Sequence, residues 1–244
     1  MILFSVLGLV ALLVLGYFIF INVSPQFGGK LSPSQLKQYA ASPNFADGKF
    51  KNAIDTDMDM DTKEMLKVTY KFLKGIPGTE PKKGLPQQNV DSTLIATNDS
   101  INRLTWLGHS TFLLELAGNK MLIDPMFGDT PAPIPMFGPQ RFNENLPIEL
   151  ESLPIIDAVL FTHDHYDHLD YGSVKALKDK VSVFYVPLGL SAHLISWGVS
   201  ENKIIELDWW EEVDLNNLKL ISTPARHFSG RSMGDRFSTL WCSW

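Results

Sequence analysis

The chain has 244 residues, of which 45% are apolar and 20% charged, with 17 Gly, 15 Pro and a single Cys. This composition excludes collagen-like, disulfide-stapled and wholly disordered proteins, and a chain of this length can bury an ordinary core without a structural metal. Its 21 Lys and Arg against 27 Asp and Glu give a net charge of −6, and without a dense basic stripe to neutralise phosphates we expect no nucleic-acid partner.

The first segment of the chain is apolar. Residues 1–23 read MILFSVLGLVALLVLGYFIFINV and contain no charged side chain, and about twenty apolar residues are enough to cross a bilayer as a helix. The alternatives are a buried core helix or a cleaved signal peptide, which normally begins with Lys or Arg and ends in a small-x-small cleavage site. Because neither signal-peptide feature is present, we expect a retained transmembrane anchor over residues 1–23. Lys30 and Lys37 follow it and favour a cytoplasmic catalytic part.

A polar extension follows the anchor. Residues 24–100 are rich in Pro, Gly and Asn and contain few alternating apolar runs. Within them, apolar residues near helical spacing predict one helix over residues 58–73, with Gly75 as its stop.

The pattern changes after Ile101, where short apolar runs alternate with turns. Strands are predicted first, and further along the chain they alternate with predicted helices, which favours sheets covered by helices over an all-β sandwich. The expected strands cover residues 103–107, 111–116, 121–123, 158–161, 183–186, 204–207, 218–223 and 238–241, and the expected helices cover residues 171–178 and 189–197.

Four potential metal ligands lie within six positions, directly after the predicted strand at residues 158–161. The segment FTHDHYDHLD holds His163, His165, Asp167 and His168. Side chains two apart on an extended segment leave on the same side, so His163 and His165 can hold one ion, while Asp167 and His168 can face a second. Imidazoles with a carboxylate and no thiolate suit zinc, and Fe or Mn nearly as well. The alternative is a chance cluster of surface residues, which is a rare event in a chain with only 6 His.

Other residues could complete or orient this site. His227 follows a predicted strand much as His163 follows its own, so it is a candidate third ligand, or else an exposed loop histidine. His193 falls in a predicted helix, where a surface or packing role is expected. His109, at a turn between strands, and Asp124, at a strand end, could orient a ligand or contact substrate, or could make only local turn hydrogen bonds.

The histidine-rich segment resembles the signature loop of the metallo-β-lactamase superfamily. Its flanking text is similar to that of N-acyl-phosphatidylethanolamine-hydrolysing phospholipases D and their bacterial relatives. The matching blocks run in order from Leu104 to Trp244 and read LTWLGHST, LIDPMF, FGPQRF, PIIDAVLFTHDHYDHLDYGSVKAL, FYVPLGL, IIELDWWEE and STPARHFSGR. The resemblance implies an α/β (α+β) domain over residues 101–244, an αββα sandwich with two zinc ions at one edge of the paired sheets.

The resemblance also implies the ligand set. His163, His165 and His227 would hold the first zinc, while Asp167, which is also the candidate catalytic residue, would hold the second together with His168. In the family a bridging Asp and a final His come from a later stretch, and this sequence has no such stretch. We therefore expect the N-terminal part of a longer enzyme, or a truncated product, with the sandwich incomplete at its C-terminus.

The expected activity is hydrolysis of a phospholipid by a metal-bound hydroxide. The resemblance and the anchor favour a phosphodiesterase of phospholipase D type that attacks N-acyl-phosphatidylethanolamine-like lipids at phosphorus. Arg226 and Arg231 could meet the phosphate, and loop 125–142 could guide acyl chains, although surface arginines are common and the apolar loop residues could instead cover the core. The alternatives are hydrolysis of a lactone, lactam or other ester, and an inactive fragment that binds a metal or a partner.

Overall fold

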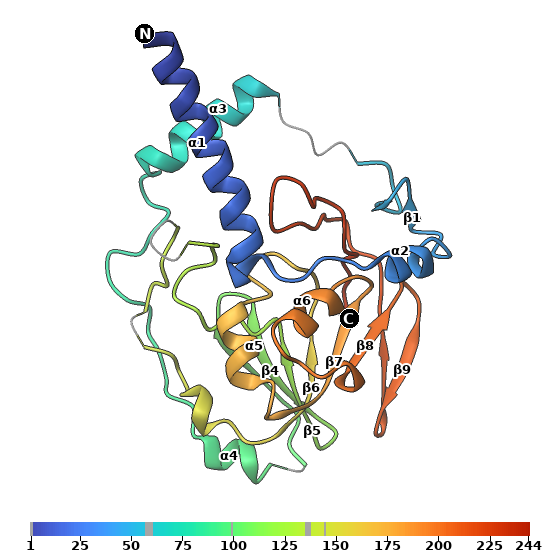
Figure 1. Cartoon of the computed structure of the whole chain (residues 1–244). Helices are drawn as coiled ribbons and strands as arrows, with labels where there is room; N and C mark the ends of the chain where they lie inside the picture. Colours follow the sequence, from blue (N-terminus) through green and yellow to red (C-terminus); the bar gives the residue numbers. More distant parts are fainter. Residues whose placement is uncertain (1, 57–60, 99, 135–137, 144) are drawn as a thin grey trace.

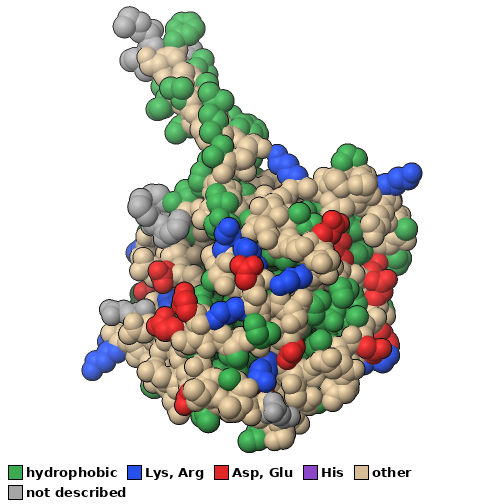
Figure 2. Space-filling view, turned by 60° about the horizontal axis from the view of Figure 1, so that its bottom comes forward, with side chains coloured by type: hydrophobic (Ala, Val, Ile, Leu, Met, Phe, Trp, Pro, Cys, Tyr) green, Lys and Arg blue, Asp and Glu red, His purple; other side chains and the backbone are tan. Residues whose placement is uncertain are grey.

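The computed structural model describes residues 2–56, 61–98, 100–134, 138–143 and 145–244. Its first element, helix α1 (Ile2–Val23), projects from the rest of the molecule (Figure 1, Figure 2). Within the described part of the chain, α1 is the one helix long and apolar enough to cross a membrane, and none of its span from Phe4 to Val23 is buried in the protein. A helix that is apolar all round needs an apolar environment, so α1 is a candidate membrane span.

The extension after α1 is more structured than its composition predicts. It forms the 3₁₀ helix η1 (Pro25–Phe27), helix α2 (Pro33–Tyr39), strands β1 (Phe45–Ala46) and β2 (Lys49–Phe50), and helices α3 (Thr62–Lys74) and α4 (Ser92–Ala96). Ser32 starts α2 with a capping box, because its hydroxyl accepts from the Gln35 N–H while the Gln35 side chain accepts from the Ser32 N–H. Tyr39 and Phe50 are buried in one cluster with Trp241, so part of the extension belongs to the folded body.

A six-stranded mixed sheet forms the centre of the fold, in the order β3-β4-β5-β6-β7-β8. Its strands are β3 (Arg103–Gly108), β4 (Thr111–Leu116), β5 (Asn119–Ile123), β6 (Ile156–Leu160), β7 (Val181–Pro187) and β8 (Ile204–Leu207). Strands β3 to β5 form an antiparallel meander, whereas β5 to β8 run parallel. The apolar run of β6 is largely buried on both faces, as expected for a central parallel strand.

Different elements cover the two faces of this sheet. They are helices α5 (Tyr171–Leu177) and α6 (Ser191–Ser196), the antiparallel hairpin of β9 (Glu212–Leu215) and β10 (Leu218–Ile221), and the 3₁₀ helices η2 (Leu150–Ser152) and η3 (Glu201–Lys203). Val159 of β6 shares one core cluster with Val174 of α5, while its neighbour Leu160 shares another with Leu215 of the hairpin. Because successive strand residues face opposite sides, the helices and the hairpin pack on opposite faces. The mixed α/β fold with a helix-covered sheet is therefore confirmed.

Some expected elements differ in the structure. The helix predicted over residues 58–73 corresponds to α3, which begins at Thr62, and residues 58–60 of the prediction lie outside the described residues. The strand predicted at residues 238–241 is wrong, because the Leu240 N–H donates to Leu188 O while the Cys242 N–H donates to Thr162 O, and these carbonyls belong to separate segments. Strand β9 and helices α2 and α4 were not predicted.

Candidate metal centre

The histidine-rich loop begins where β6 ends and leads into α5. Asp170 closes it by accepting a hydrogen bond from the Ser173 N–H at 2.7 Å, which caps the helix. The loop thus lies at the carboxyl end of a parallel strand, where α/β sheets bind ligands. Asp124 after β5 and His109 after β3 have positive φ angles of 43° and 45°. Asp and His are enriched among the few non-glycine residues in this region, and both turns lie beside the loop.

Three imidazoles meet at this loop. His163 Nε2 lies 3.0 Å from His165 Nδ1, and His227 Nε2 lies 3.1 Å from the former and 3.2 Å from the latter nitrogen. His227 comes from the segment after β10, where the Asn52 side chain accepts from its N–H at 3.1 Å and donates to its carbonyl at 2.9 Å. The structure therefore brings together the three histidines that the sequence predicted for the first ion.

The three nitrogens suit a cation better than they suit hydrogen bonds. A single N–H can point at the other two nitrogens, but the third contact then joins two lone pairs. The centre of this nearly equilateral triangle lies about 1.8 Å from each nitrogen (3.1/√3, with 3.1 Å the mean separation), close to the Zn–N bond length of about 2.0–2.1 Å. The donor set and its spacing therefore fit a metal ion such as zinc, for which the three histidines would be the protein ligands.

A chain of hydrogen bonds fixes how His163 faces the other two histidines. Its Nδ1 lies 2.9 Å from the Thr162 hydroxyl, which donates to Asp124 Oδ2 at 2.7 Å. Because the hydroxyl gives its proton to the carboxylate, it accepts from the imidazole, which assigns the proton to Nδ1 and leaves a lone pair on Nε2. Asp124, predicted as an orienting residue, also accepts from the Thr162 N–H at 2.7 Å. Asp124 therefore orients a candidate ligand through one intermediate side chain.

Asp167 and His168 lie beside the three histidines. His168 Nδ1 lies 2.8 Å from Asp124 Oδ2, and its Nε2 lies 3.7 Å from Asp167 Oδ2. His109 Nε2 contacts the same Asp167 oxygen at 3.1 Å, and the Ser110 hydroxyl donates to the Asp167 carbonyl at 2.6 Å. The turn after β3 thus holds the carboxylate from one side, and Asp124 holds the imidazole from the other.

Burial keeps the three clustered histidines neutral. Burial, followed by the neighbouring His168, His165 and His227, lowers the pKa of His163 to about 2, and burial likewise lowers the pKa values of His165 and His227. For His168, burial acts in the same direction, but the hydrogen bond and charge of Asp124 outweigh it and raise the pKa. Neutral imidazole is the form that binds a metal.

Arg231 supports the loop from the interior. Its side chain is only 3% exposed, and one terminal nitrogen donates to the carbonyls of Asp164 and Leu169 within the loop. Its Nε donates to Gln26 O at 2.8 Å, and its guanidinium lies 4.0 Å from the Tyr166 ring centroid. Arg231 was expected to support the site or to meet a phosphate; these donors meet main-chain oxygens of the protein itself, so support of the loop is the role observed, and a contact with a phosphate stays a prediction.

Two further predicted residues lie in different surroundings. Arg226 is exposed, and its Nε donates to Thr56 Oγ1 at 3.0 Å, so its contact with a phosphate stays a prediction. His193 of α6 is buried and stacks on the Trp197 ring, with Nε2 at 3.7 Å from Asp164 Oδ2. Of the two roles expected for His193, packing is the one observed.

Several residues that support the site were not predicted from the sequence. Asn52 lies 175 positions before His227, and nothing in a polar stretch marks it as a contact. Asp164 is fully buried between two candidate ligands and accepts from the Gly230 N–H at 2.8 Å and the Thr239 hydroxyl at 2.9 Å. Its place inside the histidine motif is a signal that could have identified it.

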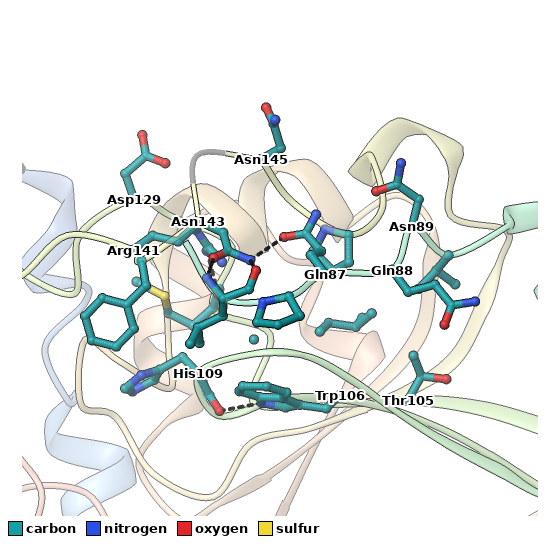
Figure 3. Close-up of a pocket in the computed structure, with 18 of the residues that line it drawn as sticks. Gln87, Gln88, Asn89, Thr105, Trp106, His109, Asp129, Arg141, Asn143 and Asn145 are labelled. Atoms are coloured by element: carbon teal, nitrogen blue, oxygen red, sulfur yellow. Dashed lines mark hydrogen bonds between the residues drawn. The ribbon is translucent and has the colours of Figure 1, made fainter. Parts of the chain in front are cut away.

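A large cavity adjoins the site on the side of His109. It has a volume of about 970 Å³ and is lined by β3, by residues 85–94 and by loops that follow β5. Figure 3 shows Trp106 and His109 on one side of this cavity and Gln87 and Asn143 on the other. This volume is at the upper end of the range for small-molecule sites.

The loop at residues 125–142 contributes to both the core and the cavity. Met126 and Phe127 are buried, which agrees with the alternative that apolar loop residues cover the core, and Met126 also reaches the cavity wall. Ile134 is partly exposed, and Met136 and Phe137 lie outside the described residues.

Comparison with known proteins gives a consistent set of relatives. A family model described as a beta-lactamase superfamily domain matches residues 119–244, just over half of the chain. An uncharacterised protein of Mycobacterium tuberculosis is 40% identical over 206 residues, which are 83% of this chain and 54% of that protein. The N-acyl-phosphatidylethanolamine-hydrolyzing phospholipase D 1 of Caenorhabditis elegans is 36% identical over 149 residues, 57% of this chain and 42% of that enzyme. A metal-dependent hydrolase of Saccharolobus solfataricus is 34% identical over 133 residues, 53% of this chain and 52% of that protein. The chain spans about half the length of these curated relatives.

Proposed function

Because the chain belongs to the beta-lactamase superfamily, we propose that it carries the metal-holding part of a membrane-anchored, zinc-dependent hydrolase. The proposed activity is that of a phosphodiesterase of phospholipase D type, which releases phosphatidic acid and an N-acylethanolamine from N-acyl-phosphatidylethanolamine-like lipids. The observation that carries the proposal is the meeting of three neutral imidazole nitrogens within 3.2 Å of one another. The relative that hydrolyses N-acyl-phosphatidylethanolamine supplies the substrate class.

The residues of the loop divide into two groups of ligands. His163, His165 and His227 would hold the first zinc ion, and Asp167 and His168 would contribute to a second. When bound by these residues, zinc would lower the pKa of a bound water to about 7 and would polarise a phosphoryl oxygen.

The remaining polar residues keep these ligands in place. Asp124 accepts from Thr162, which holds His163, and it also contacts His168. One buried carboxylate therefore orients an imidazole in each group, so a displacement of Asp124 would affect both. His109 restrains the Asp167 carboxylate on the side that faces the large cavity.

The connection from α1 to the loop supports a lipid substrate. Trp197 Nε1 donates to Pro25 O at 2.7 Å, and Arg231 Nε donates to Gln26 O at 2.8 Å. The segment directly after α1 is thus bonded to the same arginine that supports the metal loop. With α1 in a bilayer, the site is held close to the membrane surface, and the adjoining cavity has room for the apolar part of a lipid.

The charges that follow α1 bear on its orientation. Lys30 Nζ donates to Oδ1 of Asn22, in the last turn of α1, at 2.6 Å. Lys37 lies in the last turn of α2. Because basic residues beside a membrane span favour the cytoplasmic side, we place the catalytic part on that side.

Lipid product analysis tests the proposed activity. The full chain is reconstituted with zinc into vesicles that contain N-acyl-phosphatidylethanolamine, and N-acylethanolamine and phosphatidic acid are quantified. We expect both products in equal amounts, their loss on chelation, and their loss in His165→Ala and Asp167→Asn. Asp179→Asn, at an exposed carboxylate, serves as the matched control and should retain turnover. Undiminished product after chelation would contradict the proposal, and turnover of lactones or simple esters with the lipid left intact would favour a carbonyl hydrolase instead.

A further inference from the structure

Helix α3 has a strongly two-sided surface. Its apolar residues form two adjacent pairs seven positions apart on one face, and its lysines lie on the opposite face. The apolar face comprises Met65, Leu66, Phe72 and Leu73, and the lysines are Lys63, Lys67, Lys71 and Lys74. Asp61 begins the helix by accepting from the Glu64 N–H at 2.7 Å, and Gly75 ends it with a φ of 74°.

The apolar face of α3 has no cover within the described protein. No residue of the helix is buried, and the exposed fractions of Leu66, Phe72 and Leu73 are 64%, 66% and 79%. Large apolar side chains gathered on one exposed face are unfavourable in water and mark a binding surface. Something of apolar character must therefore cover this face for the helix to be stable as seen.

The charge of α3 indicates what that cover is. Four Lys and one Glu give the helix a net charge of +3, in a chain whose net charge is −6. Tyr70 lies at the border of the two faces, and Lys74 Nζ of the lysine face lies 5.6 Å from its ring centroid. A lysine-rich polar face, an apolar face and an aromatic border are the features of helices that lie in the interface of an anionic membrane.

The position of α3 agrees with this assignment. In Figure 1, α3 and α1 stand at the same end of the molecule, away from the central sheet, and α3 runs across the direction of α1. A bilayer that holds α1 would lie at this end, and α3, with 13 residues and four lysines, is too short and too charged to span it. We infer that α3 is a second membrane contact, which lies flat on an anionic lipid surface with its apolar face inserted and its lysines among the headgroups.

This inference rests on the proposed anchoring by α1 but on no part of the proposed chemistry. It can be tested with single labelled cysteines, because the native Cys242 is only 3% exposed. Leu73→Cys places an environment-sensitive fluorophore on the apolar face, and Lys67→Cys places it on the polar face as the matched control. Both full-length variants are reconstituted into phosphatidylcholine vesicles with or without phosphatidylglycerol, and flotation of the vesicles reports anchoring separately.

We expect the probe at position 73 to emit at shorter wavelength and to be quenched by lipid-borne quenchers, more strongly in anionic than in neutral vesicles. The probe at position 67 should remain accessible to aqueous iodide. Because a lysine near an anionic surface contributes about 1 kcal/mol, or about a fivefold change in partitioning, adding Lys67→Gln and Lys71→Gln should lower the ratio of inserted to exposed probe about 25-fold. Adding Glu64→Gln instead should raise it.

Three results would overturn the inference. If vesicles float with the protein while both probes stay in water, α3 does not contact the bilayer, although α1 anchors the chain. If the probe at position 73 is shielded but lipid quenchers do not reach it, a protein surface covers the face. If the chain does not float with anionic vesicles, both α1 and α3 fail as membrane contacts.

Discussion

Replacing the buried Arg231 by methionine should destabilise the protein far more than the same change at Arg226. Both arginines flank His227 in sequence, and both looked like candidate phosphate contacts. Arg231, however, donates to the main-chain oxygens of Gln26, Asp164 and Leu169. Arg231→Met keeps much of the aliphatic stem and removes these three hydrogen bonds.

The magnitude follows from the bonds that are lost. A hydrogen bond from a charged group contributes about 1.5–3 kcal/mol, and the stacking on Tyr166 contributes about 1 kcal/mol more. Part of this is offset because burial disfavours the charged guanidinium, which also lowers its pKa. Breaking a buried charged contact costs about 3–5 kcal/mol net, which for a chain of this size corresponds to a decrease in Tm of roughly 6–20 °C.

Thermal unfolding of the full chain in detergent, followed by circular dichroism, measures this difference. Arg226→Met is the matched control, because Arg226 is exposed and makes one side-chain bond, to Thr56. We expect its free energy of unfolding to stay within about 0.5 kcal/mol of the parent. If Arg231→Met melted within the same margin, the interior role of Arg231 would be refuted.

Three further predictions concern the ligands. Thr162→Val removes the hydroxyl that joins His163 to Asp124 and should weaken zinc binding about 10–100-fold, as measured by competition with a chelator. Thr162→Ser keeps the hydroxyl and should bind zinc like the parent. Equal zinc affinity of the valine variant and the parent would contradict the assigned tautomer of His163. Asn52→Ala removes two hydrogen bonds to the main chain of His227 and should lower the free energy of unfolding by about 2 kcal/mol. A denaturant midpoint equal to that of the parent would show that Asn52 of the N-terminal extension does not hold His227. In the metal-free chain, burial lowers the pKa of His163 to about 2 in the folded state, against an ordinary value of 6.5. Between these pH values the unfolded state binds one proton more than the folded state. The contribution of His163 to the free energy of unfolding is therefore complete above pH 6.5 and falls as the pH decreases, by up to about 1.4 kcal/mol per pH unit. Denaturant midpoints that do not change between pH 7.5 and 5.5 would argue against a buried neutral His163.

The central sheet and the histidine-rich loop could be predicted because their signals are local. The apolar run of β6 is buried on both faces, and the polar segment with His163 and His165 starts directly where it ends. The period of two in the strands also determines which residues face the helices and which face the hairpin.

The remaining features depend on contacts between distant segments. Residues 238–241 have the apolar character of a strand, but the Leu240 N–H donates to Leu188 O and the Cys242 N–H donates to Thr162 O. Because these two carbonyls belong to different segments, residues 238–241 do not pair with one partner strand. Strands of two residues, such as β1 and β2, are too short for any alternation to show. A buried arginine such as Arg231 has the same sequence appearance as a surface one, because only the carbonyls around it distinguish the two.

X-ray absorption at the zinc edge tests the three-histidine site most directly. The full chain is loaded with one equivalent of zinc, dialysed and compared with His227→Ala. We expect retained zinc with the scattering of three imidazoles in the parent, and weaker retention with two imidazoles in the variant. Zinc that washes out of the parent, or identical spectra for the two proteins, would contradict the convergence of His163, His165 and His227 on one ion.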